Sequence, residues 1–246
     1  MTRRLLAALV LATLTWGCLP RATREPEPRL FQCHRARGNI TIDGKIDEPA
    51  WQAAQVLDDF RLPISLERPQ SASSVRVLWD DECLYFAMVM EDLDVYGMKT
   101  EHDTRTWEDD VAELFVKPSA ADHPYYEIHV NPRNTKLDLF FPRRGAGTFD
   151  RFTPWSSGMR SAVIVKGTLN NWRDKDKGWL VEAAIPLKAF AATTPKPQLG
   201  DRWRFAFCRY DYSVHLENGR ELSSTALLTK ASFHTFEAYD DMEFAE

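Results

Sequence analysis

The stretch Trp107-Glu108-Asp109-Asp110-Val111-Ala112-Glu113-Leu114-Phe115-Val116 joins an acidic segment to an apolar one. β-Branched and aromatic residues dominate its second half, which predicts a strand buried in a sheet. Glu113 lies inside that apolar run. Because an uncompensated charge in a protein interior is costly, we expect the Glu113 carboxylate to be paired, hydrogen-bonded or directed at a ligand.

Trp107 stands six residues before Glu113. In a strand, an even offset places two side chains on the same face of the sheet, so the spacing predicts an indole beside a carboxylate. A sugar needs this pairing, because its C–H groups stack on an aromatic ring while its hydroxyl groups donate to an acid. The alternative is a core tryptophan with a structural glutamate that pairs with an arginine.

Short alternating segments lie on both sides of this stretch. In residues 124–131, Ile128 and Val130 point to one face, whereas Glu127 and His129 point to the other. About ten such strands, with turn signals every ~8–12 residues and almost no helical period, predict an all-β fold of the β-sandwich type. The expected strands are 73–80, 83–91, 110–117, 124–131, 136–142, 161–168, 178–185, 202–211, 221–228 and 240–244.

The composition excludes some classes of partner. The chain has 246 residues, of which 44% are hydrophobic, which is enough for a sizeable core. The formal net charge is −5 at pH 7. This charge argues against DNA or RNA as a partner, because phosphate binding requires a basic face. It also gives no polybasic reason to bind an anionic membrane.

The N-terminus has the pattern of an export signal. Thr2-Arg3-Arg4 is a short basic region, and residues 5–16 are an apolar run too short to span a bilayer. Gly17-Cys18 follows at once and resembles the bacterial lipobox, in which the cysteine carries lipid. We expect residues 1–18 to be a signal peptide of the lipoprotein type. The protein would then lie in the bacterial cell envelope (periplasm or outer membrane), with the membrane reached only through this anchor.

Residues 19–38 are rich in proline and arginine and have little periodicity, which predicts a flexible linker before a domain at 39–246. Beyond Cys18 the chain has Cys33, Cys83 and Cys208. These three could form one disulfide and leave one buried thiol, with a pairing that the sequence does not reveal.

Five motifs follow one another along the chain. They are Ile-Asp-Gly-Lys-Ile-Asp-Glu-Pro-Ala-Trp (42–51), Val-Leu-Trp-Asp-Asp-Glu-Cys-Leu-Tyr-Phe-Ala (77–87), Trp-Glu-Asp-Asp-Val-Ala-Glu-Leu-Phe (107–115), Tyr-Tyr-Glu-Ile-His-Val-Asn-Pro (125–132) and Gly-Trp-Leu-Val-Glu-Ala-Ala-Ile-Pro (178–186). In this order they resemble the family 9 carbohydrate-binding modules and their stand-alone relatives. The resemblance covers residues 39–246.

The resemblance implies a two-sheet, immunoglobulin-like or jelly-roll β-sandwich without catalytic residues. Such a domain binds an oligo- or polysaccharide between two aromatic rings, in polysaccharide capture or catabolism. The family's binding tryptophan and glutamate fall on Trp107 and Glu113. A family arginine falls on His129 and the second tryptophan falls on Phe233, which are two departures. Arg220 is a further candidate for a polar contact with the sugar.

A glycoside hydrolase is the alternative function. Such enzymes place two carboxyl groups across the scissile bond. Glu113 and Glu127 fall on neighbouring expected strands, and residues 108–110 add three more acids. The same acids also suit plain solvation, and no group that would orient a base is evident.

Haem binding is a third possibility, because related sandwiches bind haem. The axial ligand would come from residues such as Met88, Met90, His102 or His129, but the chain lacks Cys-x-x-Cys-His. The six histidines have no spacing typical of a transition-metal site.

Calcium is structural in some members of the family that the chain resembles. Asp92, Asp94 and Asp109 are candidate calcium ligands, since calcium takes carboxylate and carbonyl oxygens. No cofactor is otherwise required.

Overall fold

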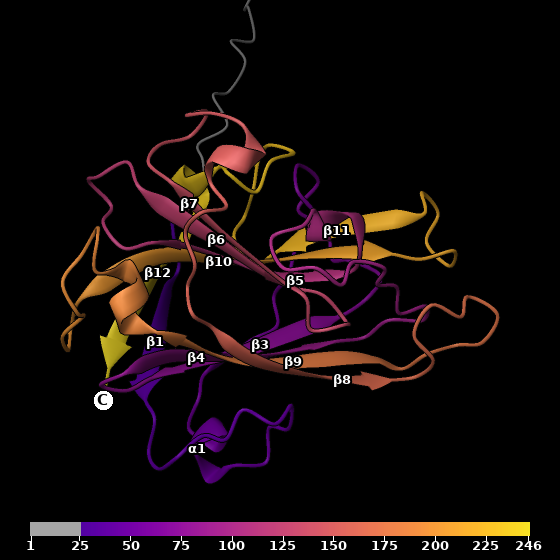
Figure 1. Cartoon of the computed structure of the whole chain (residues 1–246), viewed down its shortest axis with the longest axis horizontal. Helices are drawn as coiled ribbons and strands as arrows, with labels where there is room; N and C mark the ends of the chain where they lie inside the picture. The colour runs from indigo at the N-terminus through magenta and orange to yellow at the C-terminus, as the bar shows by residue number, and fades with distance from the viewer. Residues whose placement is uncertain (1–25) are drawn as a thin grey trace, which may run out of the picture.

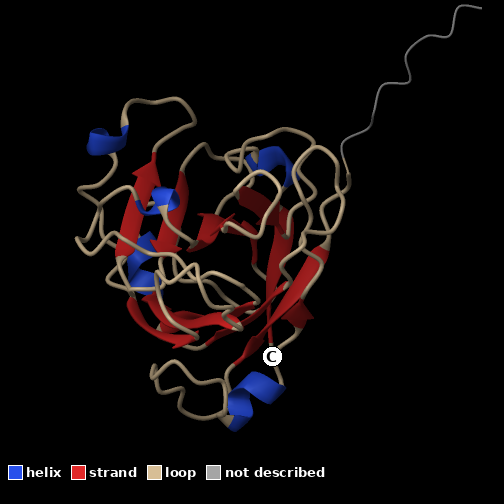
Figure 2. Cartoon of the chain, turned by 90° about the vertical axis from the view of Figure 1, so that its right-hand side faces the viewer, coloured by secondary structure: helices blue, strands red, loops and turns tan. Residues whose placement is uncertain are grey.

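The structure is a computed structural model that describes residues 26–246. The predicted signal peptide, with Cys18, lies outside the described residues. The all-β prediction is confirmed, because the described chain has twelve strands and only short helical pieces in its connections (Figure 2).

The strands pair into one continuous, curled sheet in the order β7-β6-β5-β10-β12-β1-β3-β4-β9-β8, with β11 on β10 and β2 on β3. All neighbours are antiparallel except β1, which runs parallel to both β12 and β3. The bounds are β1 Leu30–Arg35, β2 Val56–Leu57, β3 Ser73–Trp79, β4 Cys83–Met90, β5 Val111–Lys117, β6 Tyr125–Val130, β7 Lys136–Phe141, β8 Arg160–Lys166, β9 Gly178–Pro186, β10 Arg202–Tyr212, β11 Arg220–Ser224 and β12 Asp240–Ala245. The helical pieces are α1 Pro49–Gln52 and the 3-10 turns η1 Thr106–Glu108, η2 Phe149–Arg151, η3 Leu187–Phe190 and η4 Phe236–Ala238.

The sheet folds back on itself into two layers. Figure 1 shows β5, β6, β7, β10 and β11 above β3, β4, β8 and β9, with β1 and β12 at the side where the layers join. The predicted sandwich is therefore confirmed as two packed layers, although the two layers are hydrogen-bonded to each other through β12 and β1.

Alternation along the strands decides what lies between the layers. Ile128 and Val130 of β6 are in the main core cluster, as predicted, and Phe86 of β4 meets Phe207 of β10 at 5.4 Å between ring centroids. Met88 also lies in this core, 0% exposed, so it packs the interior instead of offering a ligand at the surface. Glu113 and its neighbours of the same parity point to the outer face of the upper layer.

The motif at residues 42–51 has a structural role. Glu182 of β9 is buried and accepts hydrogen bonds from the backbone N–H groups of Asp43 (3.0 Å) and Gly44 (2.9 Å). It also accepts one from the indole N–H of Trp51 (3.1 Å). These bonds hold the turn and α1 against the outer face of the lower layer.

The prediction of a linker over residues 19–38 is wrong for its second half. Residues 30–35 form β1, which is inserted between β12 and β3 and buries Phe31 and Cys33. The prolines at the start of the segment favoured a linker over a strand, and the main partner of this strand, β12, is near the C-terminus.

Cys33, Cys83 and Cys208 are all buried free thiols, so the possible disulfide among them is not formed. Cys33 is in β1, Cys83 in β4 and Cys208 in β10. Within residues 26–246, no helix has the length and apolar character to cross a membrane.

Candidate functional site

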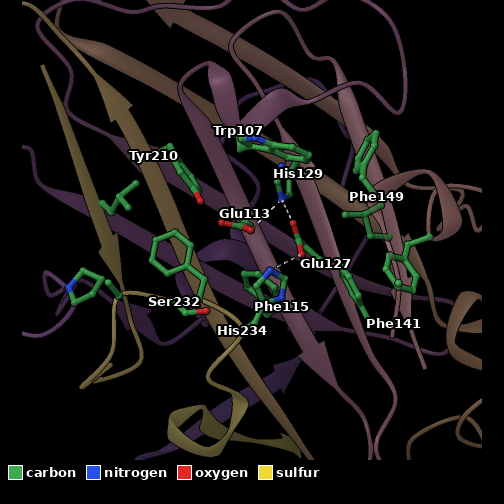
Figure 3. Close-up of a pocket in the computed structure, with 17 residues that line it drawn as sticks. Trp107, Glu113, Phe115, Glu127, His129, Phe141, Phe149, Tyr210, Ser232 and His234 are labelled. Carbon is green, nitrogen blue, oxygen red and sulfur yellow. Dashed lines mark hydrogen bonds and ion pairs between the residues drawn. The ribbon is translucent and has the colours of Figure 1, made fainter. Parts of the chain in front are cut away.

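A cavity of about 380 Å³ lies on the outer face of the layer that contains β5, β6, β7 and β10. Loop segments around residues 147–152 and 231–234 complete its walls. Glu113 and Glu127 lie near the middle of it in Figure 3, and we call it the Glu113 cavity. No lysine or arginine is among the described residues that line it.

A cluster of two acids and one imidazole forms the floor of the Glu113 cavity. Glu113 of β5 stands opposite His129 of β6, and Glu127 lies two residues before His129 on the same face. The Nε2–H of His129 donates to Glu113 Oε1 at 2.9 Å and to Glu127 Oε1 at 2.8 Å. On the other side of the ring, Nδ1 lies 2.8 Å from the hydroxyl oxygen of Thr106. Because Nε2 faces two carboxylates, it must carry a proton.

The three groups change one another's proton affinity. Burial raises the pKa of Glu113 to about 7 against the opposing charge of His129. Burial also acts to raise the pKa of Glu127, but the hydrogen bond and charge of His129 outweigh it and lower that pKa. Burial acts to lower the pKa of His129, yet the charge of Glu113 and the bonds to both carboxylates raise it to about 10. At neutral pH His129 is therefore an imidazolium whose Nδ1–H donates to Thr106.

Each carboxylate keeps one oxygen without a partner. Glu113 Oε2 and Glu127 Oε2 are buried and accept no hydrogen bond in the described chain. The His234 ring lies beside Glu127 Oε2, with its Nε2 at 3.8 Å, and the His234 side chain is 39% exposed. Buried acceptors without donors are uncommon in native proteins and need an explanation.

Aromatic rings form the walls of the cavity. Trp107 is partly exposed and packs edge-on against Phe149, with 5.1 Å between centroids. Tyr210 packs edge-on against Phe233 at 5.4 Å. Figure 3 shows the Trp107 and Tyr210 rings on two sides of Glu113, with the Tyr210 hydroxyl directed toward it. The aromatic residues of the lining are Trp107, Phe115, Phe141, Phe149, Phe152, Tyr210 and Phe233.

The structure brings four of the five predicted binding residues to this cavity: Trp107, Glu113, His129 and Phe233. Arg220 is not among them. It is exposed at the start of β11, opposite Tyr212. The prediction that Trp107 and Glu113 share one strand is wrong, because Trp107 is in the turn η1 and the strand begins only at Val111.

Glu127 was not among the predicted binding residues, although it is as central as Glu113. Its signal was present in the sequence, since the alternation of residues 124–131 puts Glu127 on the face of His129. Tyr210 and Phe149 were also missed, because their approach to the cavity depends on β10 and on the loop after β7.

The calcium candidates Asp92, Asp94 and Asp109 do not form one ligand set. Asp92 lies instead with Asp110 and Asp211 in a buried group. Arg209 Nη2 lies 3.1 Å from Asp92 Oδ2 and 3.2 Å from Asp211 Oδ2, so a guanidinium already supplies positive charge there. Arg209 thus supplies one positive charge to a group of three carboxylates.

Asp94 and Asp109 accept hydrogen bonds from residues of neighbouring loops. Asp94 Oδ2 accepts from the N–H of Val214 at 3.2 Å. Asp109 Oδ2 accepts from the N–H of Lys99 and from the Asn131 amide, each near 2.8–2.9 Å. Their carboxylates fix loops, which is a sufficient reason for their burial.

Glu113 and Glu127 are the two carboxyl groups that the hydrolase alternative requires. A glycosidase needs one carboxyl group to protonate the leaving oxygen and another to attack or to activate water. Glu113 and Glu127 both direct one oxygen at His129, and their second oxygens are buried. One donor, the Nε2–H of His129, thus holds both carboxyl groups.

Comparison with known proteins identifies one family. The sequence profile described as "Carbohydrate family 9 binding domain-like" matches residues 42–235. Endo-1,4-beta-xylanase A of Thermotoga neapolitana and that of Thermotoga maritima are each 28% identical to the chain over 90 residues. The match covers 37% of this chain and 8% of each xylanase, so the chain corresponds to a small part of those enzymes.

Solved structures with similar folds include a protein from Bacteroides uniformis named as a candidate carbohydrate-binding protein. It has a TM-score of 0.69 and 14% identity, over 89% of this chain and 100% of that chain. A family 9 carbohydrate-binding module from Caldicellulosiruptor kristjanssonii in complex with cellotriose has a TM-score of 0.57 and 16% identity, over 88% and 94% of the two chains. A family 9 carbohydrate-binding module from the same organism in complex with glucose has a TM-score of 0.54 and 16% identity, over 87% of this chain and 95% of that chain. These likenesses establish the fold.

Proposed function

Because the chain belongs to the carbohydrate family 9 binding domain-like family, we propose that the Glu113 cavity holds the end of an oligo- or polysaccharide. Carbohydrate binding without catalysis is the function of this chain.

The observation that carries the proposal is the pairing of aromatic walls with an acidic floor. A pyranose ring presents C–H groups on its faces and hydroxyl groups at its edge. Trp107 and Tyr210 are partly exposed and offer apolar surfaces for the faces, whereas Phe233 is 6% exposed and packs against Tyr210. The unpartnered oxygens of Glu113 and Glu127 would accept from the hydroxyl groups. The missing donors of these two buried acceptors would thus come from the ligand.

Access to the floor depends on a side chain at the rim. Glu127 Oε2 is buried beside His234, whose side chain is partly exposed. We expect His234 to rotate when a sugar enters, and its ring nitrogen can then bond to a hydroxyl group. His129 keeps Glu113 and Glu127 in place, since its Nε2–H holds one oxygen of each.

Calorimetric titration of the purified protein tests the proposal. Glucose, cellotriose and xylotriose are suitable probes, because structural neighbours hold the first two and the sequence relatives are xylanases. The variant Trp107→Ala should weaken binding by about 1–3 kcal/mol, the scale of stacking on an aromatic ring. Leu199→Ala, an exposed apolar residue outside the cavity, is the control. Binding that survives Trp107→Ala unchanged would refute the role of this cavity.

We also propose export to the bacterial cell envelope with a lipid on Cys18. The support is the basic start, the apolar run and Gly17-Cys18. A tethered binding domain would hold polysaccharide at the cell surface or in the periplasm for breakdown by other proteins. Metabolic labelling with palmitate tests the anchor: the protein should take up label, and Cys18→Ala should abolish it. An unlabelled wild-type protein would contradict the anchor.

A further inference from the structure

A second cavity, of about 500 Å³, lies next to the Glu113 cavity and is lined by exposed apolar side chains. The described chain has eight large hydrophobic residues that are well exposed, and three of them line this cavity: Met98 at 56%, Trp172 at 53% and Val214 at 62%. Tyr96 and Tyr212 add two partly exposed rings. A gathering of apolar residues with polar neighbours marks a binding surface, whereas scattered ones carry no meaning. We call it the Trp172 cavity.

Hydrogen bonds from two polar side chains, half-buried Asn170 and buried Asp110, hold the walls of the Trp172 cavity. Asn170 is half-buried: its side-chain oxygen accepts from the N–H of Gly97 at 2.8 Å, and its side-chain NH₂ donates to the carbonyl of Gly97 at 2.9 Å. The Asp110 carboxylate accepts from the N–H of Tyr96 at 2.6 Å and from that of Tyr212 at 2.7 Å. These bonds fix three separate segments against one another, so the exposed rings belong to a preformed surface.

The two cavities meet along η1 and β10. Trp107 lines the Glu113 cavity, and the next residue, Glu108, lines the Trp172 cavity. On β10, Tyr210 lines the Glu113 cavity and Tyr212 lines the Trp172 cavity. Their ring centroids are 6.4 Å apart and the rings are nearly parallel, at 12°. The Tyr212 hydroxyl donates to the carbonyl of Trp107 at 2.8 Å. The loops that carry the second cavity, between β8 and β9 and between β10 and β11, lie at the right-hand end of the molecule in Figure 1.

We infer that the Trp172 cavity is a second saccharide subsite, which binds further residues of the chain whose end occupies the Glu113 cavity. This inference rests on the proposed function of the Glu113 cavity. The occupant follows from continuity, because a polymer that leaves the first cavity past Trp107 and Tyr210 meets Glu108 and Tyr212 next.

The chemistry of the subsite suits a sugar. The guanidinium of Arg173 lies 4.4 Å from the centre of the Trp172 ring and covers part of it, yet the residue stays 53% exposed. The free surface of this indole can stack on a pyranose. At the rim, Glu108 and Lys99 form an ion pair at 2.6 Å with side chains 46% and 30% exposed, so acceptors and donors for hydroxyl groups are within reach of solvent.

The test compares saccharide length in three forms of the full protein. Glucose and a β-1,4-linked glucose hexamer are titrated into the wild type, Trp172→Ala and Leu199→Ala, which is 53% exposed as well but lies outside both cavities. Wild type and Leu199→Ala should bind the hexamer more tightly than glucose. Trp172→Ala should lose about tenfold in affinity for the hexamer and keep its affinity for glucose. Unchanged thermal melting of Trp172→Ala confirms that it is folded.

The other outcomes overturn the inference in distinct ways. Equal hexamer affinity in wild type and Trp172→Ala excludes the subsite and leaves the proposed function intact. Failure of the wild type to bind either probe removes the proposed function itself. A dimer in sedimentation analysis that Trp172→Ala dissociates, without an effect on hexamer binding, would assign the cavity to a second copy of the chain.

Discussion

Raising the pH above 7.5 will destabilise the fold, because His129 loses the proton that its hydrogen bonds to Glu113 and Glu127 stabilise. Its pKa is 6.5 as an ordinary imidazole and about 10 in the folded protein. A raised folded pKa contributes stability that is complete below pH 6.5 and is lost as the pH rises toward 10. Between pH 7.5 and 9 the folded state keeps one proton more than the unfolded state. The slope is then about 1.4 kcal/mol per pH unit, or about 2 kcal/mol over this window.

Between pH 7.5 and 9, the titration of His129 can be distinguished from that of the other buried groups. Burial raises the pKa of Glu113 to about 7, so its contribution is lost mainly between pH 4.5 and 7, before the window opens. Buried Cys33 and Cys208, whose pKa burial also raises, add a slope of the same sign once unfolded thiols ionise. The reference is the triple variant Glu113→Gln/Glu127→Gln/His129→Gln, because His129→Gln alone would raise the pKa of both buried carboxyl groups and give them a slope of the same sign.

Urea unfolding at half-unit pH steps measures the effect. The free energy of unfolding of the wild type should fall by about 2 kcal/mol more than that of the triple variant between pH 7.5 and 9. His129→Gln should also be less stable at pH 7.5, since it leaves two buried carboxylates without a cation. Parallel curves for the wild type and the triple variant would refute the assignment of a charged His129 to the floor.

Three further predictions concern the scaffold. Arg209→Met should destabilise the protein by about 3–5 kcal/mol in urea unfolding, because it leaves Asp92 and Asp211 buried without their cation; a loss below about 1 kcal/mol would show that the acids are neutral. Gly178→Ala should lower Tm sharply, since a Cβ there would lie 1.9 Å from the carbonyl of Met90 at a φ of +124°. Gly219→Ala, at a φ of +69° with no atom within 4 Å, controls for the backbone alone, and equal effects of the two would contradict the steric reason. Treatment with EDTA should leave Tm unchanged, because the guanidinium of Arg209 already lies among the carboxylates of Asp92 and Asp211. A clear drop in Tm would show that calcium stabilises the fold.

The sequence was informative wherever alternation decided a face. Glu127 and His129 were expected on the side opposite Ile128 and Val130, and the structure has them there. The burial of Glu113 with a polar partner was also expected, although the partner proved to be an imidazole on the neighbouring strand. These features depend on the period of a single strand, which local sequence determines.

What the sequence could not supply depends on contacts between distant segments. β1 was missed because Leu30–Arg35 pairs with Asp240–Ala245, about 210 residues away, and its own pattern buries few side chains. Trp107 reaches the Glu113 cavity from a 3-10 turn. The even spacing therefore predicted correctly that Trp107 lies near Glu113, but it assumed a strand at Trp107 that the structure does not have. The position of Arg220 follows from the β10–β11 pairing, which no spacing rule predicts.

The most direct test of the saccharide site is a titration of the ¹⁵N-labelled protein with glucose, followed by NMR. The account predicts that the indole N–H of Trp107 and the amides of Phe233 and His234 shift most, with the Trp107 signal identified by its absence in Trp107→Phe. Shifts confined to other parts of the surface, or none at millimolar glucose and cellotriose, would contradict it.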